Sequence, residues 1–163
     1  MIDVPFRLPD PYVVRHRVAA DEIDAYGHVN NAHYVRWLDR VAWDHSAALG
    51  ITPGHCLTSR RGMAVRHSRL DYLSALFESD EVLIATWICA SDGRLRCSRR
   101  FEVVRATDGV RAFEAEIDYF SLNLDTGRPS RFPPEFTSAY APLPSVLAAY
   151  EALPDAARRV GSW

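Results

Sequence analysis

One long amphipathic helix, in a chain otherwise dominated by strands, sets the strongest limit on the fold. Apolar side chains recur at steps of three and four from Tyr34 to Leu49, while charged side chains fall on the opposite side. Asn30 is suited to cap the start of this helix and Gly50 its end. A lone helix of this kind must bury its apolar face against a sheet.

The segments around the helix are typical of strands joined by tight turns. We expect a first strand at 12–18 and a loop at 51–61. Turn signals such as Ser91-Asp92-Gly93 then separate four further strands, expected at 63–72, 81–90, 95–105 and 110–122. Successive strands with short turns must be antiparallel. The sequence therefore predicts an α+β fold, in which a curved antiparallel sheet of about five strands wraps around one central helix.

Length and composition exclude several classes of protein. A chain of 163 residues, 48% apolar and 25% charged, fits one globular domain. No run of 18 apolar residues is present, so no membrane span is expected. A net charge of −2 does not provide the excess of basic residues that is typical of nucleic-acid-binding proteins. The start, Met1–Pro5, lacks the pattern of a secretory leader, and three cysteines without a CxxC pair indicate reduced core thiols. We therefore expect a cytoplasmic protein.

The composition changes after the last expected strand. Prolines recur from Pro129 onward, and a short helix is expected around 145–153. We accordingly expect a single domain at 1–135 and a Pro-rich C-terminal tail at 136–163.

The segment between the first strand and the helix contains the residues suited to chemistry. Asp24 lies a few residues before the helix, where the N–H groups of Asn31, Ala32 and His33 have no helical partner. Together with the helix dipole, such groups can stabilise a developing oxyanion. A carboxylate held nearby can act as a nucleophile or as a general base on water. This is the minimum apparatus for hydrolysing an activated acyl group such as a thioester.

Structural roles compete with these functional ones. Asp24 also fits a turn residue that accepts bonds from nearby N–H groups, and Asn30 a helix cap. Tyr34 and His45 lie on the apolar face of the helix, where core packing is the alternative. The histidines lack metal-ligand spacing, so no metal site is predicted.

The run Asp24-Ala25-Tyr26-Gly27-His28-Val29-Asn30-Asn31, followed by Tyr34, resembles the signature of hotdog-fold acyl-CoA thioesterases of the 4-hydroxybenzoyl-CoA thioesterase type. The likeness extends over roughly residues 10 to 135 and includes Leu70-Asp71-Tyr72-Leu73 and Asp125-Thr126-Gly127-Arg128-Pro129. It implies a hotdog fold and the hydrolysis of an acyl-CoA to a free acid and coenzyme A.

The resemblance also assigns roles to individual residues. It implies that Asp24 is the catalytic carboxylate, that the backbone N–H of Asn31 polarises the thioester carbonyl, and that His28 helps to hold the site. The substrate-binding residues expected are Gly27, Asn30, Tyr34, Arg94, Arg96 and Arg128. Coenzyme A enters as part of the substrate, so no separate cofactor is expected. Glu22 and His33 depart from the family pattern and bear on substrate choice.

The arginines have two interpretations. The arginines of one expected hairpin and those after the last strand could contact the coenzyme A phosphates, or as charged turns and strands they could simply face water: Arg94, Arg96, Arg99, Arg100, Arg128 and Arg131. Strand alternation puts Arg94, Arg96 and Arg100 on the face opposite Arg99.

Two further expectations concern function and assembly. A hotdog domain could bind an acyl-CoA or an acyl carrier protein without hydrolysing it, because a fold does not fix a function. A hydratase is a weaker alternative, since no second acid–base residue is evident. A single helix covers one face of the sheet and leaves its edges open, which favours two-fold pairing. The resemblance implies the same: a homodimer or a dimer of dimers, with the site at the subunit interface.

Overall fold

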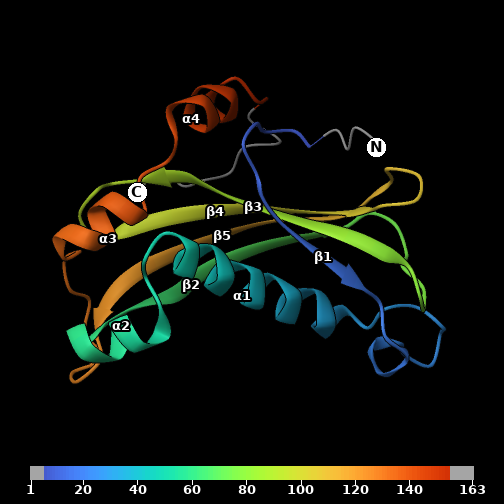
Figure 1. Cartoon of the computed structure of the whole chain (residues 1–163), viewed down its shortest axis with the longest axis horizontal. Helices are drawn as coiled ribbons and strands as arrows, with labels where there is room; N and C mark the ends of the chain where they lie inside the picture. The colour runs from blue at the N-terminus through green and yellow to red at the C-terminus, as the bar shows by residue number, and fades with distance from the viewer. Residues whose placement is uncertain (1–5, 155–163) are drawn as a thin grey trace.

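The computed structural model describes residues 6–154 (Figure 1). Met1–Pro5 and the end of the tail, 155–163, lie outside the described residues, and so do the expectations that fall on them. The elements follow the chain as β1 (Tyr12–Arg17), the 3-10 turn η1 (Ala20–Glu22), α1 (Asn31–Ala48), α2 (Pro53–Ser59), β2 (Arg61–Tyr72), β3 (Glu81–Ser91), β4 (Arg96–Arg105), β5 (Arg111–Asn123), α3 (Pro134–Ala139) and α4 (Pro144–Glu151).

The strands form one antiparallel sheet in the order β1-β3-β4-β5-β2. The register of β2 against β5 shifts between Val65 and His67, which is a β-bulge. β1 and β2 are the two edge strands. The predicted α+β architecture, with five antiparallel strands and one long helix, is confirmed.

Helix α1 lies against one face of the sheet (Figure 1). Trp37, Leu38 and Val41, at the predicted spacing, are buried against Phe101 and Phe113 of the sheet. Both predicted ends of this helix are observed. The Oδ1 atom of Asn30 accepts a hydrogen bond from the N–H of Ala32 at 3.0 Å, and Gly50 follows the helix with a φ of +90°.

The opposite face of the sheet is covered by the segment before β1 and by α4 (Figure 1). Arg100 lies fully buried on this face, where its guanidinium contacts Glu102, Glu114 and Glu116 at 3.2, 3.0 and 2.9 Å. The interpretation of the hairpin arginines as solvated is therefore wrong for Arg100, and also for Arg99, which is buried on the other face. Three glutamates on β4 and β5 make its burial possible, because they compensate the charge.

Two short helices were not predicted. Residues 51–61 were expected to form a loop, but α2 occupies most of this segment, with Thr52 Oγ1 accepting from the N–H of His55 at 3.1 Å. Helix α3 follows Pro133, and its Phe136 packs with Cys56 in a second apolar cluster. These helices form because tertiary burial stabilises segments that are too short to be helical alone.

The three cysteines were expected to be core thiols. Cys56, Cys89 and Cys97 are free and buried, and burial raises the pKa of the Cys97 thiol to about 12. The prediction of core thiols is confirmed.

Among residues 6–154, no helix has both the length and the apolar character that a membrane crossing requires.

Candidate functional site

The loop that carries Asp24 is a closed hairpin in front of α1. Ile23 and Val29 form an antiparallel bridge at its base, and the N–H of Gly27 donates to the carbonyl of Asp24 at 3.0 Å. Gly27 has a φ of +79°, a conformation that residues with a Cβ rarely adopt. The glycine therefore allows the chain to turn back and enter the helix directly after Val29.

The Asp24 carboxylate is held from within this loop. Its Oδ1 atom accepts from the backbone N–H of Tyr26 at 2.8 Å and from that of His28 at 3.4 Å. The Oδ2 atom forms no hydrogen bond with any residue that the structure describes. The turn role considered for Asp24 is thus observed, and it orients the carboxylate while leaving one oxygen available.

A cavity of about 220 Å³ lies at the start of α1. It is lined by His28, Val29, Asn31, Tyr34, Tyr72, Leu73, Ser74 and Ala75. The backbone N–H of Asn31 has no hydrogen-bond partner among residues 6–154, whereas Asn30 satisfies those of Ala32 and His33. A residue that lines the cavity therefore carries a free donor, at the positive end of the helix dipole.

The predicted residues at this end of the molecule are brought together, but not all of them line the cavity. His28 packs its ring edge-on against Phe77, with 5.3 Å between the ring centroids. Tyr34 is buried and stacks on Phe113, and burial raises its pKa to about 12, so it is a neutral cavity wall. Asp24 belongs to the adjoining hairpin and is not among the lining residues.

Sequence reasoning missed the role of Glu22, which fixes this loop to two neighbouring elements. Its buried carboxylate accepts from Trp37 Nε1 at 2.7 Å, from the N–H of Ala19 at 2.9 Å, and pairs with His16 Nε2 at 2.8 Å. Burial works to raise the pKa of Glu22, but these hydrogen bonds outweigh it and leave the pKa below its ordinary value. The other residue that departs from the family pattern, His33, has its Nδ1 atom 3.8 Å from the same carboxylate.

The candidate coenzyme A arginines lie at the other end of the sheet. Arg96 of β4 pairs with Phe120 of β5, which in turn pairs with Ala64 of β2. The cavity lies beside Tyr72, further along β2. Eight residues of strand separate these positions, which is roughly 25 Å. Arg94 and Arg128 flank the same far end and are exposed. Within one protomer, the structure therefore does not bring Arg94, Arg96 and Arg128 together with Asp24.

Comparisons with known proteins identify the class of fold. A 1,4-dihydroxy-2-naphthoyl-CoA thioesterase from Synechocystis superposes with a TM-score of 0.72 at 12% identity, covering 80% of this chain and 96% of that one. A Staphylococcus aureus protein solved in complex with CoA gives 0.75 at 18% identity, covering 96% and 90%. A DHNA-CoA thioesterase from the same organism gives 0.73 at 20% identity, covering 80% and 88%. The chain has the hotdog fold.

The sequence profile of the thioesterase-like superfamily matches residues 6–140, and the chain belongs to that superfamily. No curated protein sequence matches it significantly. At the identities above, the likeness to solved structures is a likeness of fold.

Proposed function

We propose that this protein hydrolyses an acyl-CoA thioester to a free acid and coenzyme A. The observation that carries the proposal is the free N–H of Asn31, a residue that lines the cavity at the start of α1, directly after the hairpin that holds Asp24. Membership of the thioesterase-like superfamily supports the reaction class. The two thioesterases and the CoA complex among the structural neighbours support acyl-CoA as the substrate.

The proposed roles follow from the geometry. The thioester carbonyl oxygen would accept a hydrogen bond from the N–H of Asn31, where the helix dipole favours the negative charge of the tetrahedral intermediate. The unbonded Oδ2 atom of Asp24 would take a proton from water or attack the thioester carbon. His28 would position Asp24 through its backbone N–H. Gly27 and Asn30 would shape the approach, and Tyr34 would form the wall beside the acyl group.

We also propose that the working species is a homodimer, or a dimer of dimers, paired through β2. This edge strand exposes Val65 and Tyr72, and the neighbouring side of α1 exposes Val35 and Trp43. Pairing two β2 edges would cover these apolar side chains and remove an open sheet edge. A partner subunit could then supply the arginines that one protomer holds roughly 25 Å from its own cavity. An active species sedimenting at the monomer mass of 18.4 kDa would contradict this assembly.

The test of the reaction is thiol release from a panel of acyl-CoAs, with Asp24→Asn as the diagnostic variant. Asparagine keeps an Oδ1 acceptor for the N–H of Tyr26, so the hairpin is retained while the proton acceptor is lost. We expect kcat to fall about 10²- to 10⁴-fold. Asp21→Asn is the matched control, because Asp21 is exposed and lies in the same segment. Equal turnover by Asp24→Asn and Asp21→Asn would remove Asp24 from the chemistry.

Two further measurements refine the result. Tight binding of acyl-CoA without thiol release across the panel would favour the alternative function, a non-catalytic acyl-CoA or acyl-carrier-protein binding domain. Where turnover occurs, a single turnover in isotopically labelled water distinguishes the two roles of the carboxylate. Label in Asp24 itself indicates nucleophilic attack, and label only in the product acid, together with failure of hydroxylamine to trap an acyl–Asp24 anhydride, indicates general-base catalysis.

A further inference from the structure

A second cavity lies between α1 and the sheet, far from Asp24, and it contains a buried cation. Arg99 of β4 is only 2% exposed, on the face that packs against α1. Among residues 6–154, Arg99 forms no ion pair, whereas the adjacent Arg100 contacts three glutamates. A buried charge without a counter-ion is costly, and proteins normally pair it.

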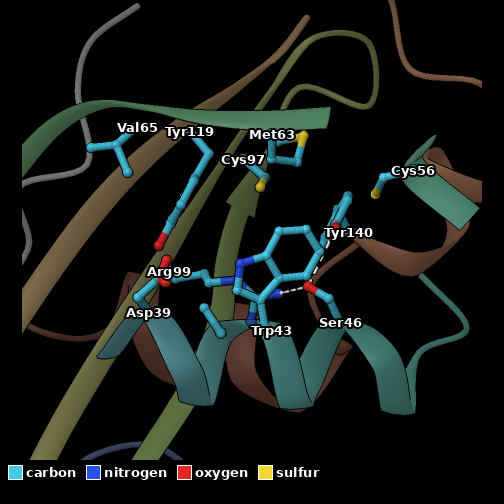
Figure 2. Close-up of a pocket in the computed structure, with 11 residues that line it drawn as sticks. Asp39, Trp43, Ser46, Cys56, Met63, Val65, Cys97, Arg99, Tyr119 and Tyr140 are labelled. Carbon is cyan, nitrogen blue, oxygen red and sulfur yellow. Dashed lines mark hydrogen bonds between the residues drawn. The ribbon is translucent and has the colours of Figure 1, made fainter. Parts of the chain in front are cut away.

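The groups bonded to Arg99 are neutral. One terminal nitrogen lies 2.8 Å from His45 Nδ1. The other donates to Ser46 Oγ at 2.9 Å, a bond that Figure 2 shows. Burial, together with the charge of Arg99, lowers the pKa of His45 to about 4, so this imidazole is uncharged near neutrality. Arg99 also lies over the ring of Tyr140, 5.7 Å from its centroid. A guanidinium has five N–H donors, so three remain beyond the two hydrogen bonds.

The cavity has the size and lining to admit a small anionic group. Its volume is about 80 Å³, several times what a water molecule needs. Arg99 extends from β4 toward Ser46 on α1, with Tyr119 and Tyr140 nearby (Figure 2). The mouth is formed by the exposed residues Asp39, Trp43 and Val65. Asp39 forms no ion pair with Arg99, and its exposed carboxylate is screened by water.

We propose that this cavity binds a carboxylate, paired with Arg99, and that the carboxylate is the far end of the acyl group. The substrate class would then be ω-carboxyacyl thioesters, which deepens the proposed hydrolysis and rests on it for the identity of the substrate. A guanidinium matches the planar carboxylate with parallel N–H donors. The apolar side chains around it, such as Met63 and Cys97, would contact the methylene groups.

The position of the cavity along α1 limits how the acyl group reaches it. Asn31 and Trp43 are twelve residues apart in the helix, which is about 18 Å. Within one protomer, only a long acyl group would span this distance. In the proposed dimer, antiparallel pairing of the β2 edges would run the partner's α1 in the opposite direction. A shorter acyl group could then reach Arg99 from the helix start of the partner.

Binding of the carboxylate is tested first, without any turnover. Calorimetric titration of the wild-type protein with hexanoate and adipate should show binding, and titration with the neutral hexanamide should not. NMR should show the pKa of His45 rising when hexanoate is bound, because the anion offsets the charge of Arg99. Failure of both carboxylates to bind, or an unchanged His45 titration on binding, would overturn the proposal even if every Arg99 variant failed to fold.

The acyl preference is tested next, with Arg99→Met as the diagnostic variant and Arg99→Lys as the variant that keeps the charge. Adipyl- and hexadecanedioyl-CoA are compared with the neutral hexanoyl- and palmitoyl-CoA. Wild-type kcat/KM should favour the ω-carboxyacyl member of a matched pair by about 10- to 100-fold, the value of one charge-assisted hydrogen bond. Arg99→Met should lose this preference, and Arg99→Lys should keep part of it.

The control for removing an arginine is Arg15→Met, since Arg15 is exposed on β1 and pairs with Glu81. It should leave the preference unchanged. Equal kcat/KM for the members of each pair in the wild type would overturn the ω-carboxyacyl assignment, and binding of hexanoate would then indicate a site for free carboxylates. An absence of thiol release from every CoA ester would contradict the proposed hydrolysis, while the titrations would still decide whether Arg99 binds a carboxylate.

Discussion

The titration of His45 predicts a loss of stability between pH 7 and pH 5. His45 is partly buried, stacks on Tyr12 with 4.9 Å between ring centroids, and has Arg99 at 2.8 Å. Burial is the main cause that lowers its pKa from 6.5 to about 4, and the positive charge of Arg99 adds to it. His45 and Asp10 both line a further cavity, of about 150 Å³, but the two side chains form no ion pair with each other.

The sign and the size of the effect follow from linkage. Below pH 6.5 the unfolded chain protonates His45, whereas the folded chain does so only near pH 4. Because the unfolded state binds more protons in this window, the free energy of unfolding falls as the pH falls. With these two pKa values, the loss between pH 7 and pH 5 is about 2 kcal/mol. The lowered pKa of Glu22 affects stability only below its ordinary value of 4.5, so it falls outside this range.

The assay is urea unfolding of the wild type and of His45→Asn at both pH values. The Oδ1 atom of asparagine can replace Nδ1 as the acceptor for Arg99, but it does not titrate. The free energy of unfolding of the wild type should fall by about 2 kcal/mol more than that of His45→Asn. Equal losses in the two proteins would refute the reasoning, because every other titrating group is common to both.

Three substitutions in the Asp24 hairpin give further predictions, each measured by urea unfolding at pH 7. Gly27→Ala should lower the free energy of unfolding by about 1 kcal/mol, because alanine is strained at a φ of +79°. Gly54→Ala in α2 should not lower it. Asn30→Ala should lower the free energy of unfolding by about 1 kcal/mol, because it removes the helix cap. An unchanged free energy would mean that water replaces the hydrogen bond of the cap. Glu22→Gln should lower the free energy of unfolding by about 2 kcal/mol, since its single amide oxygen cannot accept from both Trp37 and Ala19; a loss no larger than that of Asp21→Asn would contradict the anchoring role.

The elements governed by local physics were predictable from the sequence. Helix α1 was predicted because its apolar spacing, its cap at Asn30 and its glycine at position 50 agree with one another. The strands were predicted within one or two residues at most ends, since each ends in a turn with its own sequence signal. By contrast, α2 was missed because Thr52-Pro53-Gly54 is as typical of a turn as of a helix start, and burial of Cys56 decides between them.

The parts of the molecule that depend on distant residues were not predictable. Glu22 is a structural anchor because η1, β1 and α1 converge on its carboxylate, and no local pattern indicates such convergence. Strand alternation correctly placed Arg99 and Arg100 on opposite faces. It could not predict that three glutamates would enclose Arg100, or that Ser46 and Tyr140 would close over Arg99.

In the proposed reaction, the cavity of Asn31 and the cavity of Arg99 have separate roles along α1. The start of α1 provides the N–H of Asn31, which suits the reacting carbonyl, while its C-terminal half covers Arg99, which suits the recognition of an acyl group. Within one protomer, about 18 Å of helix separates them, beyond the range at which substitutions usually couple. The effects of Asp24→Asn and Arg99→Met on the transition-state free energy should therefore be additive. Asp24→Asn should lower the turnover of every substrate, and Arg99→Met should change which substrate is preferred. Such independence would let the proposed acyl specificity change by substitution under the C-terminal half of α1, while the hairpin of Asp24, fixed by Glu22 and Gly27, stays as it is.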